Sequence, residues 1–152
     1  MRKKLFLELL MWLITIVIVI LVLFPIYLKV PDYPFWLSNT VFVVTTITLV
    51  RYIFLLKLTW LAHMQKMKVA CLLLMIPLVS YLISELNFFQ VYLDENDIES
   101  FIGHLDHGNM MQMDKYIRAE MVFFGTTAII SCFIFQVRMV ISVWRKHNAQ
   151  GI

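Results

Sequence analysis

Long apolar runs alternate with short polar connections along this chain. The runs cover residues 5–28, 35–56, 69–92 and 116–144. A bilayer core about 30 Å thick takes roughly 20 helical residues, so each run is long enough to cross it. The first run is rich in β-branched residues, but an isolated strand would leave its backbone unpaired in lipid. The pattern therefore predicts an all-α membrane protein: a single integral membrane domain over residues 1–152, with four transmembrane helices in a bundle.

The connections between the runs are short and contain prolines or basic residues. Pro31 and Pro34 mark the first connection, because proline ends a helix. We expect the second run to continue as an amphipathic helix to about residue 64, and a basic turn at residues 65–68 to precede the third run. Pro77 lies inside the third run, where we expect it to kink the helix.

The longest polar stretch, residues 93–115, lies between the third and fourth runs and holds six of the ten acidic residues. Within it, the apolar positions follow the i, i+3, i+4, i+7 spacing of one helix face. These positions are Ile98, Phe101, Ile102 and Leu105. A short helix with a single apolar face is typical of the membrane surface. We therefore expect a short amphipathic surface helix within an outer acidic loop.

Composition supports a membrane environment. Only 15% of the residues are charged and 61% are hydrophobic, whereas a soluble domain has roughly 25% charged residues. A soluble fold of 152 residues could not cover so much apolar surface. Nucleic-acid binding is not indicated, because no basic patch falls on a soluble segment. The lipid bilayer is therefore the expected surrounding of most of the chain.

The distribution of charge predicts an orientation. Four spans place both termini on one side of the membrane, and that side receives ten of the thirteen basic residues but one of the ten acidic residues. Lys and Arg near the ends of spans stay on the cytoplasmic side. We expect cytoplasmic termini and an extracytoplasmic loop at residues 93–115. A basic N-terminal anchor with short loops fits a bacterial inner (cytoplasmic) membrane.

Ionisable residues inside spans are costly and often functional. Near the outer surface the apolar runs contain Asn39, Glu85, Arg118 and Glu120. Glu85 and Glu120 could form a carboxylate pair that binds a cation or shares a proton. Alternatively, Arg118 or Lys115 could neutralise them, and we favour these ion pairs because the cations reach the same layer.

Near the inner surface lie Glu8, Arg51 and Arg138. Glu8 is the only acidic residue on that side. It could clamp two helices together by pairing with Arg51 or with Arg138. In the alternative, both arginines extend to the lipid headgroups.

The last run carries a polar stripe along one helix face, formed by Glu120, Thr127, Ser131, Arg138 and Arg145. Small residues mark a second face, namely Gly125, Ala128 and Cys132. Such faces permit close approach of helices and face a bundle interior or another subunit. They could simply hold the four helices together, or they could bind a partner.

A weak metal-site pattern lies in the polar stretch. His104 and His107 are three residues apart and are followed by Met110, Met111 and Met113. Imidazole and thioether groups together could suit a copper ion. Solvated histidines and methionines in contact with lipid give the same pattern.

No catalytic motif is found: the sequence contains no G-x-S-x-G, no H-E-x-x-H and no glycine-rich phosphate loop. We predict no cofactor. The leading interpretation is a non-catalytic accessory, assembly or stabilising subunit that packs against other membrane helices or self-associates. The alternatives are a small cation transporter or channel that uses the outer carboxylates, and an outward-facing metal-binding or sensing protein.

Overall fold

The computed structural model describes residues 2–56, 65–96 and 98–150. All regular structure within these ranges is helical. The helices are α1 (Arg2–Lys29), α2 (Trp36–Leu55), α3 (Gln65–Asn96), α4 (Glu99–Ile102) and α5 (His107–Gln150). Four of them, α1, α2, α3 and α5, are long and apolar enough to cross a membrane. The four predicted spans are thereby matched by four candidate spanning helices.

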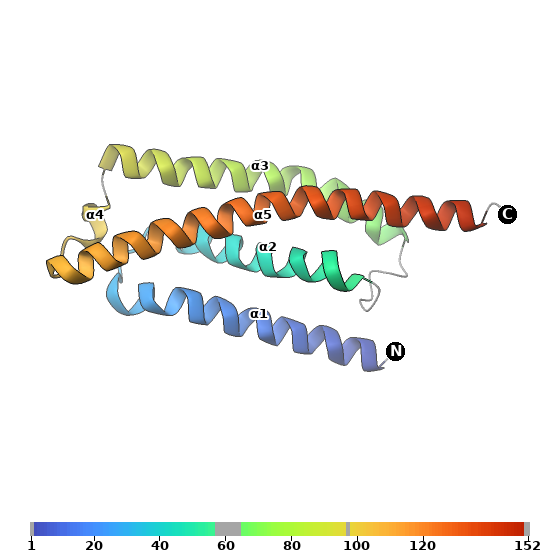
Figure 1. Cartoon of the computed structure of the whole chain (residues 1–152), viewed down its shortest axis with the longest axis horizontal. Helices are drawn as coiled ribbons and strands as arrows, with labels where there is room; N and C mark the ends of the chain where they lie inside the picture. Colours follow the sequence, from blue (N-terminus) through green and yellow to red (C-terminus); the bar gives the residue numbers. More distant parts are fainter. Residues whose placement is uncertain (1, 57–64, 97, 151–152) are drawn as a thin grey trace.

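The long helices alternate in direction along the chain, so both termini lie at one end and α4 lies at the other (Figure 1). This arrangement makes α2 and α5 parallel to one another. These two helices pack most extensively, while α3 packs against α5 and α1 packs against α2. Within the most apolar 18 residues of each span, 50% are buried in α2 and 28% in α5, against 17% in α1 and 6% in α3. The centre of the molecule is therefore the α2–α5 pair, with α1 and α3 on its outside.

Two helix boundaries differ from the sequence prediction. Helix α3 continues to Asn96, and α5 begins at His107. The expected outer loop at residues 93–115 is thus reduced to residues 97–106, which include α4. The length of an apolar run reflects the thickness that a spanning helix must cross. The helix itself can continue beyond the run with polar side chains until a cap ends it.

The segment after α2 also differs from expectation in part. The expected continuation of the second helix to about residue 64 lies outside the described residues. The expected turn at residues 65–68 was wrong, because these residues form the first turn of α3. A turn and a first helical turn carry similar polar residues, so composition alone does not separate them.

Helix α4 is a single turn whose apolar side chains face the protein. Ile98, Phe101 and Ile102 are buried in the main core, and Leu105 packs against it. The ring of Phe101 lies 5.8 Å from the ring of Tyr33, in an edge-to-face arrangement. The apolar face that the sequence predicts therefore closes one end of the bundle, and little of it is left to contact a membrane surface.

Gly125 lets three helices meet. A Cβ atom at this position of α5 would come within 2.9 Å of Leu86 Cδ1 on α3 and 3.3 Å of Phe42 Cε2 on α2. Ala128 and Cys132, on the same face, are fully buried. The predicted small-residue face therefore contacts α2 and α3 inside the bundle.

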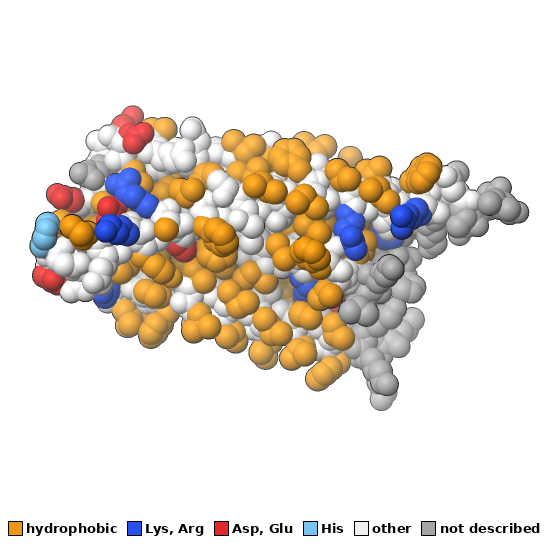
Figure 2. Space-filling view, viewed as in Figure 1, with side chains coloured by type: hydrophobic (Ala, Val, Ile, Leu, Met, Phe, Trp, Pro, Cys, Tyr) orange, Lys and Arg blue, Asp and Glu red, His pale blue; other side chains and the backbone are white. Residues whose placement is uncertain are grey.

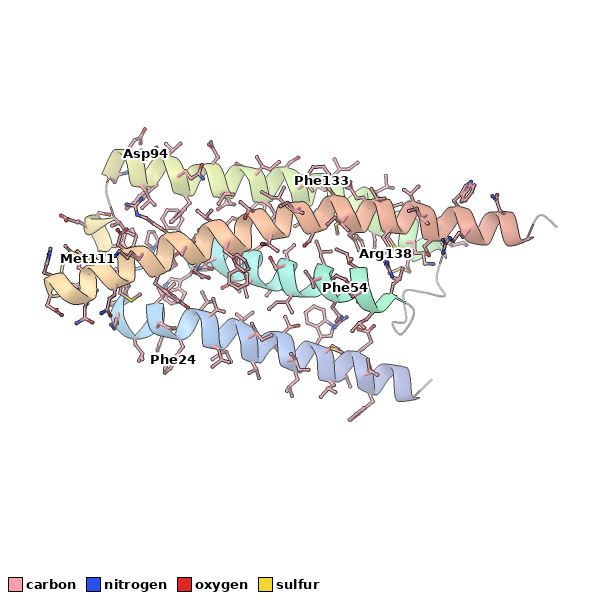
Figure 3. All side chains as sticks on the ribbon, in the orientation of Figure 1. Phe24, Phe54, Asp94, Met111, Phe133 and Arg138 are labelled. Atoms are coloured by element: carbon pink, nitrogen blue, oxygen red, sulfur yellow. The ribbon has the colours of Figure 1, made fainter. Side chains whose placement is uncertain are left out.

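Apolar side chains cover much of the outer surface, and charged side chains gather mainly toward the two ends (Figure 2). Phe24, Phe54 and Phe133, from three different helices, are 51%, 75% and 53% exposed. Figure 3 shows Asp94 and Met111 at the α4 end and Arg138 toward the end that holds the termini. An exposed apolar belt between polar ends is typical of proteins that lipid surrounds.

Candidate functional site

A buried polar cluster lies where α2 begins. Asn39, in the first turns of α2, is fully buried, and Glu120 of α5 is 7% exposed. Asn39 Nδ2 donates a hydrogen bond of 2.7 Å to Glu120 Oε2. The same amide group donates to the hydroxyl oxygen of Tyr33 at 3.3 Å. Asn39 therefore joins α2 to α5 and to the connection that precedes α2.

The second outer carboxylate is held by the neighbouring residue. Ser38 Oγ donates a hydrogen bond to Glu85 Oε2 on α3. Consecutive residues of α2 thus bind carboxylates from two other helices. Both carboxylates are bound by side chains in the first turns of α2. A cation or proton shared directly between Glu85 and Glu120 stays a prediction.

Two atoms of this cluster lack hydrogen-bond partners within the described residues: Asn39 Oδ1 and Glu120 Oε1. Both are buried acceptors, and a buried acceptor without a partner is destabilising. The hydroxyl of Tyr33 is held in its protonated form, because burial raises the pKa of this phenol and the Glu120 carboxylate raises it further. The hydrogen bond from Asn39 lowers the same pKa, but by less. The cluster is therefore rich in oxygen acceptors and has two open acceptor positions.

One ion pair of Arg118 is local. Arg118 Nε lies 2.5 Å from Asp114 Oδ1, one turn earlier on α5. Both side chains are about one third or more exposed, so the pair contributes little to stability. An ion pair of Arg118 or Lys115 with Glu85 or Glu120 stays a prediction, whereas the hydrogen bonds to Asn39 and Ser38 are present in the structure.

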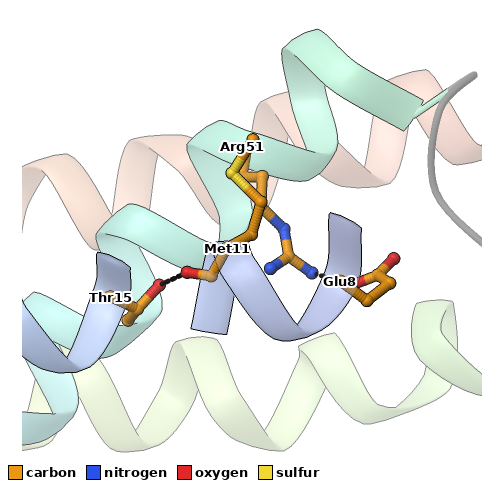
Figure 4. A network of polar contacts seen from close by, with 4 residues as sticks. All are labelled: Glu8, Met11, Thr15 and Arg51. Atoms are coloured by element: carbon orange, nitrogen blue, oxygen red, sulfur yellow. Dashed lines mark hydrogen bonds and ion pairs between the residues drawn. The ribbon is translucent and has the colours of Figure 1, made fainter. Parts of the chain in front are cut away.

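An inner cluster joins α1 to α2 (Figure 4). Arg51 Nη2 lies 2.5 Å from Glu8 Oε2. The guanidinium also lies over the rings of Tyr52, at 4.6 Å, and Trp12, at 5.8 Å. Of the two clamps considered from the sequence, the structure shows the one between Glu8 and Arg51. Its arginine side chain is only 6% exposed, which makes this a mostly buried pair.

Two other cations lie toward the same end. Arg138 of α5 is half-buried, and its Nε atom has no hydrogen-bond partner within the described residues. Lys68 of α3 is 2% exposed, and its Nζ donates to Ser142 Oγ on α5 at 2.9 Å. Sequence reasoning missed Lys68 as an interhelical residue, because it was assigned to a turn. The available signal in the sequence was its position three residues after Gln65, directly before a long apolar run, which is compatible with the first turn of a helix.

The polar stripe of α5 turns toward the bundle along most of its length. Glu120 and Ser131 are buried, Thr127 and Arg138 are half-buried, and Arg145 is exposed. Thr46 of α2 adds a hydrogen bond of 3.0 Å to the backbone carbonyl of Phe124. These contacts fit the interpretation in which the stripe holds the helices together.

The α4 end is fastened by a polar network that contains one of the predicted metal ligands. His104 Nε2 donates to the backbone carbonyl of Lys29 at 2.9 Å, and Lys29 Nζ donates to Asn109 Oδ1 at 2.7 Å. Asp106 caps α5 by accepting from the backbone N–H and the side-chain amide of Asn109. Both hydrogen bonds lower the pKa of Asp106, and the bond from the side-chain amide has the larger effect. The network ties the C-terminus of α1 to the start of α5.

The other predicted metal ligands lie on α5 and not in a loop. His107 is exposed, Met110 is half-buried, and Met113 is 3% exposed within the core. Among the residues that the structure describes, no cluster of three or more His, Cys, Asp or Glu side chains is placed to hold a metal ion. A site that uses His104, His107 and the methionines stays a prediction.

Tyr33 and Ser38 are functional candidates that sequence reasoning missed. Both lie within a few residues of Asn39, which the sequence did place in the outer polar layer. Comparison with known proteins gives no match to this chain, whether with family models, curated proteins or solved structures.

Proposed function

We propose that this chain is an integral membrane protein of four spans that serves as a non-catalytic accessory, assembly or stabilising subunit. In this proposal, it packs against the helices of another membrane protein or of a second copy of itself. The observation that carries the proposal is a polar face on α3, formed by Ser80, Ser84 and Asn87. All three side chains are exposed.

This α3 polar face points away from the rest of the protein. At 100° per residue it lies opposite the buried residues Leu82 and Leu86. Ser80 Oγ donates to its own helix, at the Ile76 carbonyl. Within the described residues, the side chains of Ser84 and Asn87 have no hydrogen-bond partner.

The position of the α3 polar face along the helix makes water an unsuitable partner. The α3 span has 31 residues, which at 1.5 Å per residue is about 46 Å, against a hydrocarbon core of about 30 Å. Even with several residues projecting at each end, the two serines fall inside the core. Small residues four apart permit close helix approach, and polar side chains hydrogen-bond across helix pairs in lipid. A partner helix supplies both the contact and the hydrogen bonds.

The proposed orientation places both termini in the cytoplasm and α4 on the extracytoplasmic side, in a bacterial inner membrane. Support comes from Arg51 near the end of α2, from Lys68 at the start of α3, and from Arg138, which lies toward the end that holds the termini (Figure 3). Asp94 lies at the α4 end, and Asp106 directly precedes α5. Positive charge stays on the cytoplasmic side during insertion.

Site-directed photocrosslinking tests the partner. A photoreactive residue replaces Ser84, and the matched control replaces Ile83, which lies 100° away around the same helix at the same depth. In native membranes, position 84 on the α3 polar face should give a protein adduct of defined mass. An adduct of twice the mass of the chain would identify a second copy. Equal adducts at both positions, or adducts with lipid only, would contradict the proposal.

Cation transport is a second candidate function, favoured by the open acceptor atoms of Asn39 and Glu120. A cation path needs oxygen ligands inside the bundle, and these two residues supply two of them. Ion flux into proteoliposomes should then fall in Glu120→Gln and in Glu85→Gln. Unchanged flux in both variants would remove the outer carboxylates from any transport mechanism.

A further inference from the structure

Asn39 and Glu120 are an amide and a carboxyl group in contact. A carboxylic acid and an amide can form two parallel hydrogen bonds, one in each direction. The structure shows one of them, from Asn39 Nδ2 to Glu120 Oε2 at 2.7 Å. The atoms that would form the other, Asn39 Oδ1 and Glu120 Oε1, are the two buried oxygens without a partner in the described part of the chain.

Both unpartnered atoms are acceptors. An amide oxygen and a carboxylate oxygen cannot hydrogen-bond to one another, because neither carries a hydrogen. A proton on Glu120 Oε1 would make that atom a donor, and a hydrogen bond from it to Asn39 Oδ1 would give both oxygens a partner. The proton would also remove a negative charge from a side chain that is only 7% exposed, where an ionised carboxylate is poorly solvated.

We propose that Asn39 and Glu120 form a proton-binding site between α2 and α5. Glu120 holds the proton on Oε1 and donates it to Asn39 Oδ1, while Asn39 Nδ2 donates to Glu120 Oε2. On binding, a hydrogen ion from water joins the carboxylate to give a neutral acid. On release, the O–H bond breaks and the hydrogen ion returns to water, which leaves the carboxylate charge.

The surroundings of the pair favour a proton over a metal cation. A hard cation takes about six oxygen ligands, whereas the pair offers two open oxygens and a proton needs only two partners. Phe101 of α4 covers Tyr33 from outside at 5.8 Å between ring centroids, which restricts water at this end. The site therefore suits the smallest cation and is shielded from bulk solvent.

Among the described residues, three other titratable groups are linked to this pair or lie one turn away, and none of the three is a cation. Tyr33 lies in the connection before α2 and contacts Asn39. Tyr116, one turn earlier on α5, donates its hydroxyl hydrogen to the Val22 carbonyl of α1 at 2.7 Å. Glu85 of α3 is bonded to Ser38, next to Asn39. None of these three side chains supplies a positive charge to Glu120.

Infrared spectroscopy of the purified full chain in lipid tests the site directly. A protonated carboxylic acid has a carbonyl band that a carboxylate lacks, and this band should be present at pH 7. Glu120→Gln should remove it, and the matched control Glu85→Gln should keep it. Absence of the band at pH 7, or its persistence in Glu120→Gln, would overturn the proposal.

A pH series of thermal stability gives an independent readout. Glutamine at position 120 carries a permanent donor for Asn39 Oδ1, so Glu120→Gln should melt at the wild-type temperature at pH 7. It should also lose the fall in melting temperature that the wild type shows when alkaline pH removes the proton. A metal cation at the site would give the opposite: a destabilised glutamine variant and a wild-type melting temperature that rises with sodium or potassium. If Glu120→Gln does not fold, Asn39→Leu should keep the carboxylic-acid band but shift it, because the acceptor is gone, and an unshifted band would count against the pair.

Discussion

Substitution of Gly125 by alanine tests how closely the three helices meet. The added Cβ would lie 2.9 Å from Leu86 Cδ1 and 3.3 Å from Phe42 Cε2. Carbon atoms in favourable contact are about 3.5–4.0 Å apart. The Leu86 methyl group would therefore have to move away by roughly half an ångström or more. Leu86 is 9% exposed and Phe42 is fully buried, so the packed core around them leaves little space for this movement.

The expected magnitude combines two opposing effects. Overpacking of a filled core costs about 1–3 kcal/mol. Replacement of glycine by alanine in a helix returns about 0.5–1 kcal/mol through backbone entropy. We expect a net destabilisation of about 1–2 kcal/mol, which for a chain of this length lowers the melting temperature by roughly 2–8 °C.

Unfolding of the purified protein in mild detergent, followed by circular dichroism, measures this change. Gly108→Ala is the matched control, because the nearest atom to its added Cβ is Asp106 Oδ2 at 3.4 Å. The control should be as stable as the wild type or more stable, since only the helix propensity changes. If Gly125→Ala were as stable as Gly108→Ala, α5 would not lie against α2 and α3 at this position.

Three further predictions concern single contacts, each measured by the same unfolding assay. Arg51→Met should cost about 3–5 kcal/mol, because it removes the guanidinium from the Glu8 carboxylate in a mostly buried site, and the double variant Glu8→Leu, Arg51→Met should recover most of the loss; additive losses would contradict the pairing. Thr46→Val should cost about 0.6 kcal/mol through the lost bond to Phe124, and an unchanged stability would mean that this bond is absent. Ionised Asp106, whose pKa is lowered, stabilises the fold above the ordinary aspartate pKa of about 3.9, and this stabilisation is lost as the pH falls through the lowered value. Asp106→Asn should therefore lack this loss of stability at acid pH. An unaltered dependence of stability on acid pH would refute the cap.

Hydrophobic patterning predicts the four long helices of this protein well, because each is built around a long uninterrupted apolar run. The ends of α3 and α5 are predicted less well. Asp106 caps α5, so the helix begins at His107, nine residues before the apolar run at 116–144. A cap is a local hydrogen bond among polar residues, and the same residues also suit a loop.

The pairing of polar residues follows from the sequence only where the choice is small. The sequence limited the inner pair to Glu8 with Arg51 or Arg138, because Glu8 is the only acid expected on that side of the membrane, and the structure shows the pair with Arg51. The partner of Glu120 could not be limited in this way, since it depends on how α2 and α5 are rotated about their axes. Apolar residues surround both helices, and van der Waals packing in lipid sets that rotation.

Accessibility of single cysteines to a membrane-impermeant thiol reagent tests the central claim, that four helices cross the membrane and leave α4 and the termini on opposite sides. Glu99→Cys, on α4, and Asn148→Cys, near the C-terminus, place a thiol at exposed positions, and the wild-type chain gives the background from its two native cysteines. In intact cells we expect labelling of Glu99→Cys only, with Asn148→Cys labelled after the membrane is permeabilised. Labelling of both variants from the same side would contradict the arrangement of spans, and labelling of Asn148→Cys alone in intact cells would reverse the proposed orientation.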